Sequence, residues 1–188
     1  NYSASVEGIV IPAAWVHSSI NAHLKLKINA TGIKLSTLDV ADEGKDKNAL
    51  CHRHGILVDS VESWSGKGSD IYESVKKAMH NSIIHGSTVL IYDADGLGAG
   101  VRGYAKRISL ETKNKLIVDP FRGSGKVFNP RGQMMERRFN EDMFANAKAQ
   151  AWWALRQRFL ETHRAVAGDI KYDENKIISI SNGFAEFN

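Results

Sequence analysis

The sequence is poor in cysteine: Cys51 is the only one among 188 residues, which excludes an internal disulfide and fits a reducing compartment. Long apolar runs are also missing, since no segment approaches the roughly 20 residues that a membrane-spanning helix requires. No signal-peptide pattern is present. We therefore expect a soluble, intracellular protein with no membrane association. Because the chain starts at Asn1 and not at methionine, we also expect it to be a segment of a longer protein.

Nucleotide-binding and zinc-binding motifs are absent or incomplete. No Gly-x-x-x-x-Gly-Lys-Ser/Thr segment occurs, which excludes a P-loop. Residues 96–100 read Gly-x-Gly-x-Gly, whereas a dinucleotide site needs Gly-x-Gly-x-x-Gly. These glycines therefore favour a turn. The seven histidines are scattered and complete no zinc spacing with Cys51, so we interpret them as surface residues or phosphate contacts.

The composition is that of an ordered globular domain. Hydrophobic residues make up 43% of the chain and charged residues 24%, which supplies a well-packed core and argues against extensive disorder. The net charge is +4 and the isoelectric point is near 9.1. This mild positive charge permits a polyanionic partner such as nucleic acid but does not require one.

The order of expected elements predicts an α/β fold with a mixed sheet in one domain over residues 1–188. Three strands come first and form a meander, and the second and third are joined by a tight turn at His54-Gly55. Helices and strands then alternate, which is typical of parallel strands covered by helices. The strands are expected at 35–40, 48–54, 56–64, 88–92, 115–121 and 177–180, and the helices at 13–26, 70–85, about 100–107 and 140–167.

Two aspartates occupy the ends of predicted strands. Asp39 ends the first strand and Asp93 ends the nearly all-apolar fourth one. If these two strands are neighbours, the carboxylates meet at one edge of the sheet, where functional groups gather in open α/β sheets. Converging carboxylates without histidine or cysteine favour Mg²⁺ or Mn²⁺, and such a site can hold two ions roughly 3.5–4 Å apart. An aspartate at a strand end also serves as a turn former or helix cap, and the spacing alone leaves both readings open.

Basic residues gather in segments that are rich in glycine. Such segments suit sequence-independent contacts with phosphates, although a solvated surface is the ordinary role of any one of these side chains. The residues that we interpret as candidates for DNA binding are Arg102, Arg107, Arg122, Lys126 and Arg131.

Several motifs together resemble the nuclease domain of bacteriophage terminase large subunits. Residues 38–49 are similar to the first acidic motif of that family, and residues 92–101 are similar to the second. Residues 144–159 resemble the long helix of the headful-packaging branch, and Ile9, Pro12, Trp15 and residues 119–123 also match that branch. The resemblance extends from about Gly8 to Ile180.

The resemblance implies a ribonuclease H-like fold and metal-dependent endonuclease activity on concatemeric double-stranded DNA during genome packaging. Asp39 and Asp93 would be the catalytic metal ligands, with Asp46 as an accessory acid, and the cofactor would be Mg²⁺ or Mn²⁺, two ions in all. Asp42 and Asp95 would help through water or only form turns. The implied partners of the full subunit are the small terminase subunit and the portal protein, in the cytoplasm of the host cell.

Two departures from the family pattern leave alternatives open. The family's nuclease follows an ATPase motor with a P-loop, which this chain lacks, so it resembles the C-terminal part of such a subunit. The family's third metal carboxylate lies in a Pro-Asn-Leu-Ala-Asp segment close to the C-terminus, and we expect it to lie beyond Asn188 or to be replaced by Asp142, Asp169, Asp173 or Glu174. The alternatives are a DNA-gripping module of the packaging motor that does not cut, and a resolvase-type nuclease of the same fold.

Overall fold

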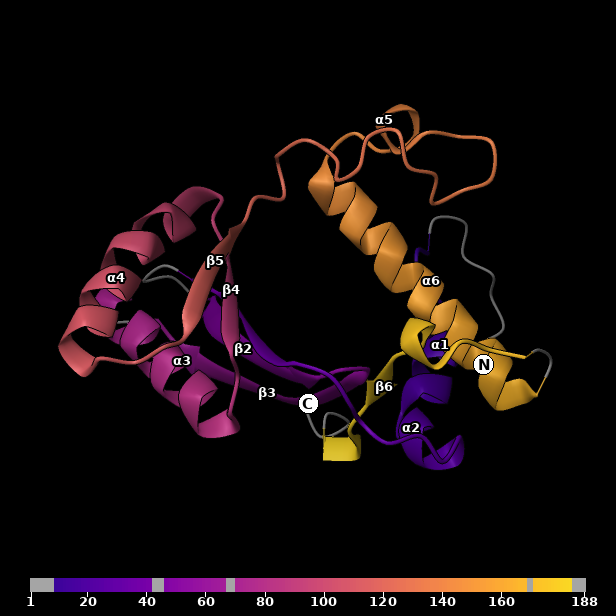
Figure 1. Ribbon diagram of the computed structural model, residues 1–188, viewed down its shortest axis with the longest axis horizontal. Helices are drawn as coiled ribbons and strands as arrows, with labels where there is room; N and C mark the ends of the chain where they lie inside the picture. The colour runs from indigo at the N-terminus through magenta and orange to yellow at the C-terminus, as the bar shows by residue number, and fades with distance from the viewer. Residues whose placement is uncertain (1–8, 42–45, 67–69, 169–170, 184–188) are drawn as a thin grey trace.

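A mixed six-stranded sheet forms the centre of the protein (Figure 1). The computed structural model describes residues 9–41, 46–66, 70–168 and 171–183. The strand order is β5-β4-β1-β2-β3-β6, in which β1, β2 and β3 are antiparallel while β4 and β5 run parallel to β1. The strands are β1 (Lys34–Asp39), β2 (Lys47–His54), β3 (Leu57–Ser65), β4 (Val89–Asp93), β5 (Ile117–Phe121) and β6 (Ser179–Ile180). The predicted meander and mixed sheet are confirmed.

Helices cover the two sides of this sheet unequally. Figure 1 shows α3 and α4 packed together on one side, and α6 on the other side with α1 and α2 beside it. The helices are α1 (Ala13–Ser19), α2 (Ala22–Lys25), α3 (Ile71–His85), α4 (Val101–Thr112), α5 (Asn140–Met143) and α6 (Ala147–Ala167), with short 3₁₀ turns η1 (Gly96–Gly100) and η2 (Glu174–Lys176). No helix of the described ranges combines the length and apolar character needed to cross a membrane.

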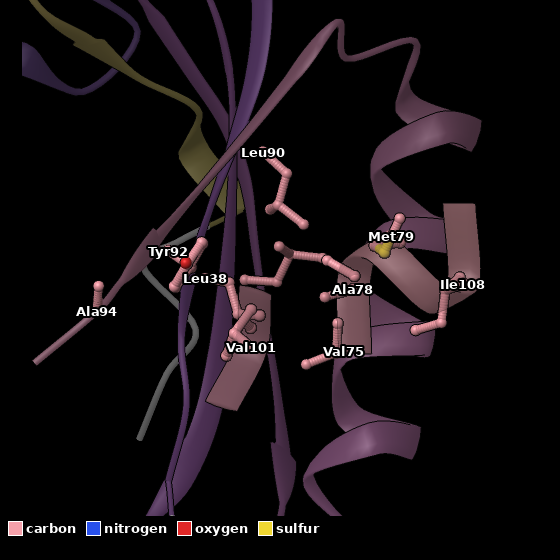
Figure 2. Packing of buried hydrophobic residues seen from close by; sticks show 11 residues of the cluster. Leu38, Val75, Ala78, Met79, Leu90, Tyr92, Ala94, Val101 and Ile108 are labelled. Carbon is pink, nitrogen blue, oxygen red and sulfur yellow. The ribbon is translucent and has the colours of Figure 1, made fainter. Parts of the chain in front are cut away.

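The hydrophobic core lies between the sheet and the α3–α4 layer (Figure 2). Strand residues Leu38, Leu90 and Tyr92 are each at most 2% exposed and face the helices. Val75 and Met79 of α3 meet them from the other side, at 0% and 1% exposure. Since each fully buried side chain of this size contributes roughly 1.5–3 kcal/mol, this layer fixes the positions of β1 and β4 relative to each other.

The α3 helix begins and ends where its local sequence directs. Asp70 accepts a hydrogen bond from the Tyr72 backbone N–H at 3.2 Å, which satisfies one of the free donors at the first turn. Gly86 ends the helix in the left-handed conformation, with φ of +81°. Both ends of α3 are therefore set by residues next to the helix, Asp70 and Gly86.

Two predicted helices are interrupted. The stretch expected as one helix over 13–26 breaks at Ile20 and Asn21, where Ile20 is extended and bridges to Ile180. The helix expected over 140–167 is divided into α5 and α6, because Phe144 is extended and the Asn146 side chain caps α6 by accepting from the Ala149 backbone N–H at 2.9 Å. Periodicity alone could not locate these breaks, since the apolar spacing continues across both.

Candidate metal centre

Asp39 and Asp93 lie side by side at the ends of two adjacent parallel strands. β1 and β4 pair in register, with Leu38 opposite Tyr92, so the next residues on the two strands are Asp39 and Asp93. Neighbouring strands are about 4.7–4.9 Å apart, which brings both carboxylates to the same edge of the sheet. The condition stated for the sequence, that the first and fourth strands are neighbours, is met.

Both aspartates belong to the face of the sheet that α3 and α4 do not cover. Side chains alternate along a strand, and Leu38 and Tyr92 point into the core, so Asp39 and Asp93 point the opposite way. On this face Thr37 and Asp39 are exposed, and Asp93 is half-buried. We call the face that carries Thr37, Asp39 and Asp93 the open face; a polyanionic substrate could reach the paired carboxylates from this side.

Asp93 is held by the turn that follows it. Its Oδ1 accepts a hydrogen bond from the Asp95 backbone N–H at 3.0 Å, which fixes the direction of the carboxylate. The Asp95 side chain faces elsewhere: it accepts from the backbone N–H of Ser124 at 2.8 Å and from the Ser124 hydroxyl at 2.8 Å. These bonds, with the charge of Arg122, hold the pKa of Asp95 below its usual value. Asp95 therefore connects the loop after β4 to the loop after β5.

Gly98 allows η1 to lie directly against Asp93. A Cβ at this position would lie 1.6 Å from the Asp93 carbonyl oxygen and 2.7 Å from its carbonyl carbon. No side chain fits there without moving the backbone of Asp93 or of η1. The sequence assigned this segment to a turn. The structure shows that position 98 requires glycine because η1 approaches Asp93 closely there.

The turn after Asp39 depends on a buried asparagine. Asn48 is 0% exposed, and its Oδ1 accepts from the Ala41 backbone N–H at 3.1 Å. Its Nδ2 donates to the Ser74 hydroxyl at 3.3 Å, and Ser74 also accepts from the Trp64 indole at 3.3 Å. This network joins β2, β3 and α3 to the end of β1. Sequence reasoning missed it, because a polar residue in a short strand carries no sign of its partner.

The other acids do not complete a three-ligand cluster. Within the described ranges, no group of three His, Cys, Asp or Glu side chains could hold a metal ion. Asp46 is exposed and precedes β2, outside the pair formed by Asp39 and Asp93, so its accessory role stays a prediction. Asp119 is exposed on the open face of β5, where it pairs with Ile91. It lies two residues before Phe121, which pairs with Asp93. Alternation in the predicted strand 115–121 could have identified it.

The remaining acids proposed from the sequence lie away from this pair or outside the described residues. Asp142 is exposed on α5, and Asp173 caps η2 by accepting from the Asn175 backbone N–H at 2.9 Å. Glu174 lies on η2, beyond the opposite end of β1. Asp42 and Asp169 fall outside the described residues. None of the described three is a third ligand in this arrangement.

Two of the predicted DNA-binding arginines lie on α4, in the layer behind the sheet. Arg107 donates through Nε to Glu111 at 2.8 Å, and its guanidinium lies 5.1 Å from the centre of the Tyr72 ring. Arg102 is exposed on the first turn of the helix. Since α4 covers the core face, Arg107 does not share a surface with the carboxylates.

The other three lie in the segment after β5. Arg122 and Lys126 are exposed and make no ion pair with the described residues. Arg131 donates to Glu141 at 3.1 Å and lies 5.4 Å from the centre of the Phe139 ring. The structure brings Arg122 to the candidate site, because it directly follows Phe121, which pairs with Asp93 across β4 and β5. The DNA-binding roles of all these residues stay predictions.

The segment that carries them is fixed by two buried side chains. Asn140 donates through Nδ2 to the Asn129 carbonyl at 2.9 Å and accepts from the Met134 backbone N–H at 3.0 Å. Gln150 of α6 accepts from the Phe128 backbone N–H and donates to the Phe128 carbonyl at 2.9 Å. This glycine-containing segment is therefore held by hydrogen bonds along much of its length.

One histidine expected at the surface belongs to the interior. His52 is 3% exposed. Its Nδ1 forms a hydrogen bond with the Ser36 hydroxyl at 2.8 Å, and its Nε2 forms one with Glu62 at 3.1 Å. Its ring stacks on His85 with centroids 4.5 Å apart. The expectation of a surface residue is wrong for His52, because Ser36 and Glu62 on the neighbouring strands supply both ring nitrogens with partners.

Comparison of the sequence with protein families and with curated proteins finds no match. Solved structures do match. The nuclease domain of the large terminase subunit of bacterial virus Sf6 is 29% identical, with a TM-score of 0.84 over 93% of this chain and 74% of that one. A variant of that domain solved with manganese and beta-thujaplicinol matches to the same extent, as does one with calcium. The resemblance inferred from the sequence is confirmed: this chain has the ribonuclease H-like fold of a terminase large subunit nuclease domain.

Proposed function

We propose that this chain is a divalent-metal-dependent endonuclease domain that cuts concatemeric double-stranded DNA during viral genome packaging. The observation that carries the proposal is the in-register placement of Asp39 and Asp93 on adjacent parallel strands. Similarity to a terminase nuclease domain that was solved with manganese supports it. In this context the partners would be DNA, the small terminase subunit and the portal protein, and the site of action would be the host cytoplasm.

The donor set fits a hard divalent cation. Asp39 and Asp93 offer carboxylate oxygens only, and within the described part of the chain no histidine or cysteine joins them in a cluster. Oxygen ligands of this kind suit Mg²⁺ or Mn²⁺. When bound, one or two such ions would activate water and offset negative charge on the phosphodiester. Asp39 and Asp93 would hold them, and Asp46 would assist from the start of β2.

The chain's own residues position the substrate and the ligands. The Asp95 backbone N–H orients the Asp93 carboxylate, and the Asp95–Ser124 bonds keep Arg122 beside the same edge. Arg122 and Lys126 would contact DNA phosphates, as would Arg102 from the start of α4. Contacts of this kind carry little base information, so we expect low sequence specificity.

Cleavage of supercoiled plasmid tests this proposal. Wild-type protein should nick and linearise plasmid with Mn²⁺ or Mg²⁺ and should not do so in EDTA. Asp39→Asn and Asp93→Asn should abolish cutting while leaving the melting temperature and the circular dichroism spectrum unchanged, because both side chains lie outside the core. Glu136→Gln, which alters a strongly exposed carboxylate on another segment, is the control. Unchanged cutting in both aspartate variants would refute the assignment.

The absence of a third carboxylate in the described cluster favours a second candidate function. A domain that grips DNA without cutting would need the basic segment but not the aspartate pair. In that case plasmid binding would persist and no metal would restore cutting, while Arg122→Gln with Lys126→Gln would remove binding. The same variants in the endonuclease would weaken cutting at low DNA concentration and spare it at high concentration.

A further inference from the structure

A pocket lies at the other end of β1 from Asp39. It has a volume of about 230 Å³ and lies between the segment before β1, the β2–β3 turn, α6 and η2. Its lining is mainly polar, with two arginines and one carboxylate among the side chains. The polar lining residues are Asn29, Thr31, Arg53, Arg158, Glu174 and Asn175.

Arg53 carries a positive charge into this pocket. It is half-buried on β2, and its Nε is buried and has no hydrogen-bond partner among the residues that the structure describes. It makes no ion pair with any residue of the described ranges, and Glu174, although it lines the same pocket, is not bonded to it. Burying a charged nitrogen without a partner costs free energy, so stabilisation of the fold does not explain an arginine at this position.

Arg158 places a second guanidinium close to the first. Its Nη1 donates to the carbonyl oxygens of Asn175 at 2.9 Å and Ile177 at 3.1 Å, which fixes the guanidinium group against η2. Its other nitrogens make no hydrogen bond to the described residues. Burial, and then the charge of Arg158, hold the pKa of Arg53 below its usual value. A fixed guanidinium group beside an unpaired one, in the same polar pocket, suits an anion bound between them.

The pocket belongs to the same face as the candidate metal centre. Arg53 pairs with Leu35 across β1 and β2, as Ala49 pairs with Asp39, so Arg53 is on the open face. Leu35 and Asp39 are four residues apart on β1, a distance of about 13 Å along the strand. A duplex advances about 3.4 Å per base pair, so this distance corresponds to roughly four base-pair steps.

We propose that Arg53 and Arg158 form a phosphate-binding pocket on the open face, which holds a backbone phosphate of the DNA whose scissile phosphodiester lies at Asp39 and Asp93. Polar groups of Asn29, Thr31 and Asn175 supply further contacts to the phosphate oxygens. Glu174 opposes binding by its charge. The DNA part of this inference rests on the proposed endonuclease function, whereas phosphate recognition by the pocket does not.

Inorganic phosphate tests the pocket without DNA or metal. Phosphate at 100 mM should raise the melting temperature of the wild-type protein by about 3–5 °C over sodium chloride of equal ionic strength. Arg53→Met keeps the apolar stem and removes the charge, so it should lose this rise without lowering the melting temperature in chloride. Arg53→Lys should keep part of the rise, and Glu174→Gln should enlarge it. Arg164→Gln, on the same helix with its charge paired to Glu161, should change nothing.

A duplex of about 20 base pairs in EDTA tests the DNA part. In Arg53→Met the affinity should fall about tenfold, and the slope of log K against log salt should decrease by about 0.9, as for the loss of one phosphate contact. Arg164→Gln should match wild type in both measurements.

The outcomes separate the two proposals. A phosphate response that survives Arg53→Met, or a loss of several degrees in chloride, would overturn the pocket and make Arg53 a structural residue. A lost phosphate response with an unchanged salt slope would support a site for free phosphate and overturn its role on DNA. Wild-type protein that responds to phosphate but never cuts plasmid would contradict only the endonuclease.

Discussion

The backbone of Gly98 lies against Asp93, so closely that a Cβ on Gly98 would come within 1.6 Å of the Asp93 carbonyl oxygen. Gly98→Ala must therefore displace either η1 or the end of β4, which carries a candidate metal ligand. We expect a stability loss of about 1–3 kcal/mol, as for overpacking, together with at least a tenfold loss of plasmid cutting. Urea unfolding and plasmid cleavage measure the two effects.

Gly103 offers a matched control for this substitution. It lies inside α4, and a Cβ there would meet nothing within 4 Å. Gly103→Ala should stabilise the protein by about 0.5–1 kcal/mol, because alanine loses less backbone entropy in a helix, and should leave cutting unchanged. Equal damage from both substitutions would show that the close approach to Asp93 does not matter for activity.

The Asp95–Ser124 pair should act on activity through position and not through metal ligation. Both oxygens of Asp95 already accept hydrogen bonds from Ser124, at 2.8 Å each. Ser124→Ala removes one of these bonds, and Asp95→Ala removes both. We expect a graded reduction in cutting, smaller for Ser124→Ala, larger for Asp95→Ala and complete for Asp93→Asn. The measurement is the cleavage rate across a manganese titration; a complete loss in Asp95→Ala that excess metal does not relieve would instead make Asp95 a ligand.

Two of the predicted DNA contacts should behave differently. Arg122 makes no ion pair with the described residues and lies near Asp95, whereas Arg107 is paired with Glu111 behind the sheet. Arg122→Gln should weaken duplex binding about tenfold and reduce the salt slope by about 0.9. Arg107→Gln should leave both unchanged. Binding isotherms at several salt concentrations decide this, and an equal effect of both substitutions would place DNA across the α4 layer.

Acid should destabilise the protein through His85. Burial is the main cause that lowers the pKa of His85; the neighbouring charges of His52 and Lys34 add to it, and the bond to Asp59 opposes it. The folded state therefore binds this proton more weakly than the unfolded state does. The stability that neutral His85 contributes is therefore fully present above the unfolded pKa of about 6.5. It decreases as the pH falls below that value towards the folded pKa.

Urea unfolding between pH 5 and 8 measures this dependence. His85→Gln should flatten the curve over that interval, because the glutamine amide does not titrate. His54→Gln, on the same sheet, is the control and should retain the wild-type curve. A His85→Gln curve as steep as that of the wild type would assign the acid sensitivity to another residue.

The sequence predicted those features whose causes are local. Alternating apolar residues located the meander, and the aspartates that end two strands could be paired as soon as those strands were assumed to be neighbours. Asp70 could be recognised as a cap because its partner is two residues away. The resemblance to terminase nucleases then assigned chemistry to Asp39 and Asp93 that spacing alone left open.

The features that sequence reasoning missed depend on contacts between distant segments. Asn48 holds the turn after β1 through Ser74, 26 residues further along the chain. His52 is buried because Ser36 and Glu62 meet it from two other strands. The division between α5 and α6 follows from an asparagine cap inside a continuous apolar pattern, and Arg53 became a candidate only when β2 and α6 were placed together.

α6 connects the two regions proposed to contact DNA. Near its start, the Lys148 backbone N–H donates to the Gly123 carbonyl at 2.9 Å, next to the Asp95–Ser124 pair. Arg158 follows ten residues later, a rise of about 15 Å along a helix. The strand β1 spans a similar interval between Leu35 and Asp39, so two stiff elements independently set one separation. The distance between the phosphate proposed to bind at Arg53 and the phosphodiester proposed to be cut is therefore set by a strand and a helix, and loops contribute little to it.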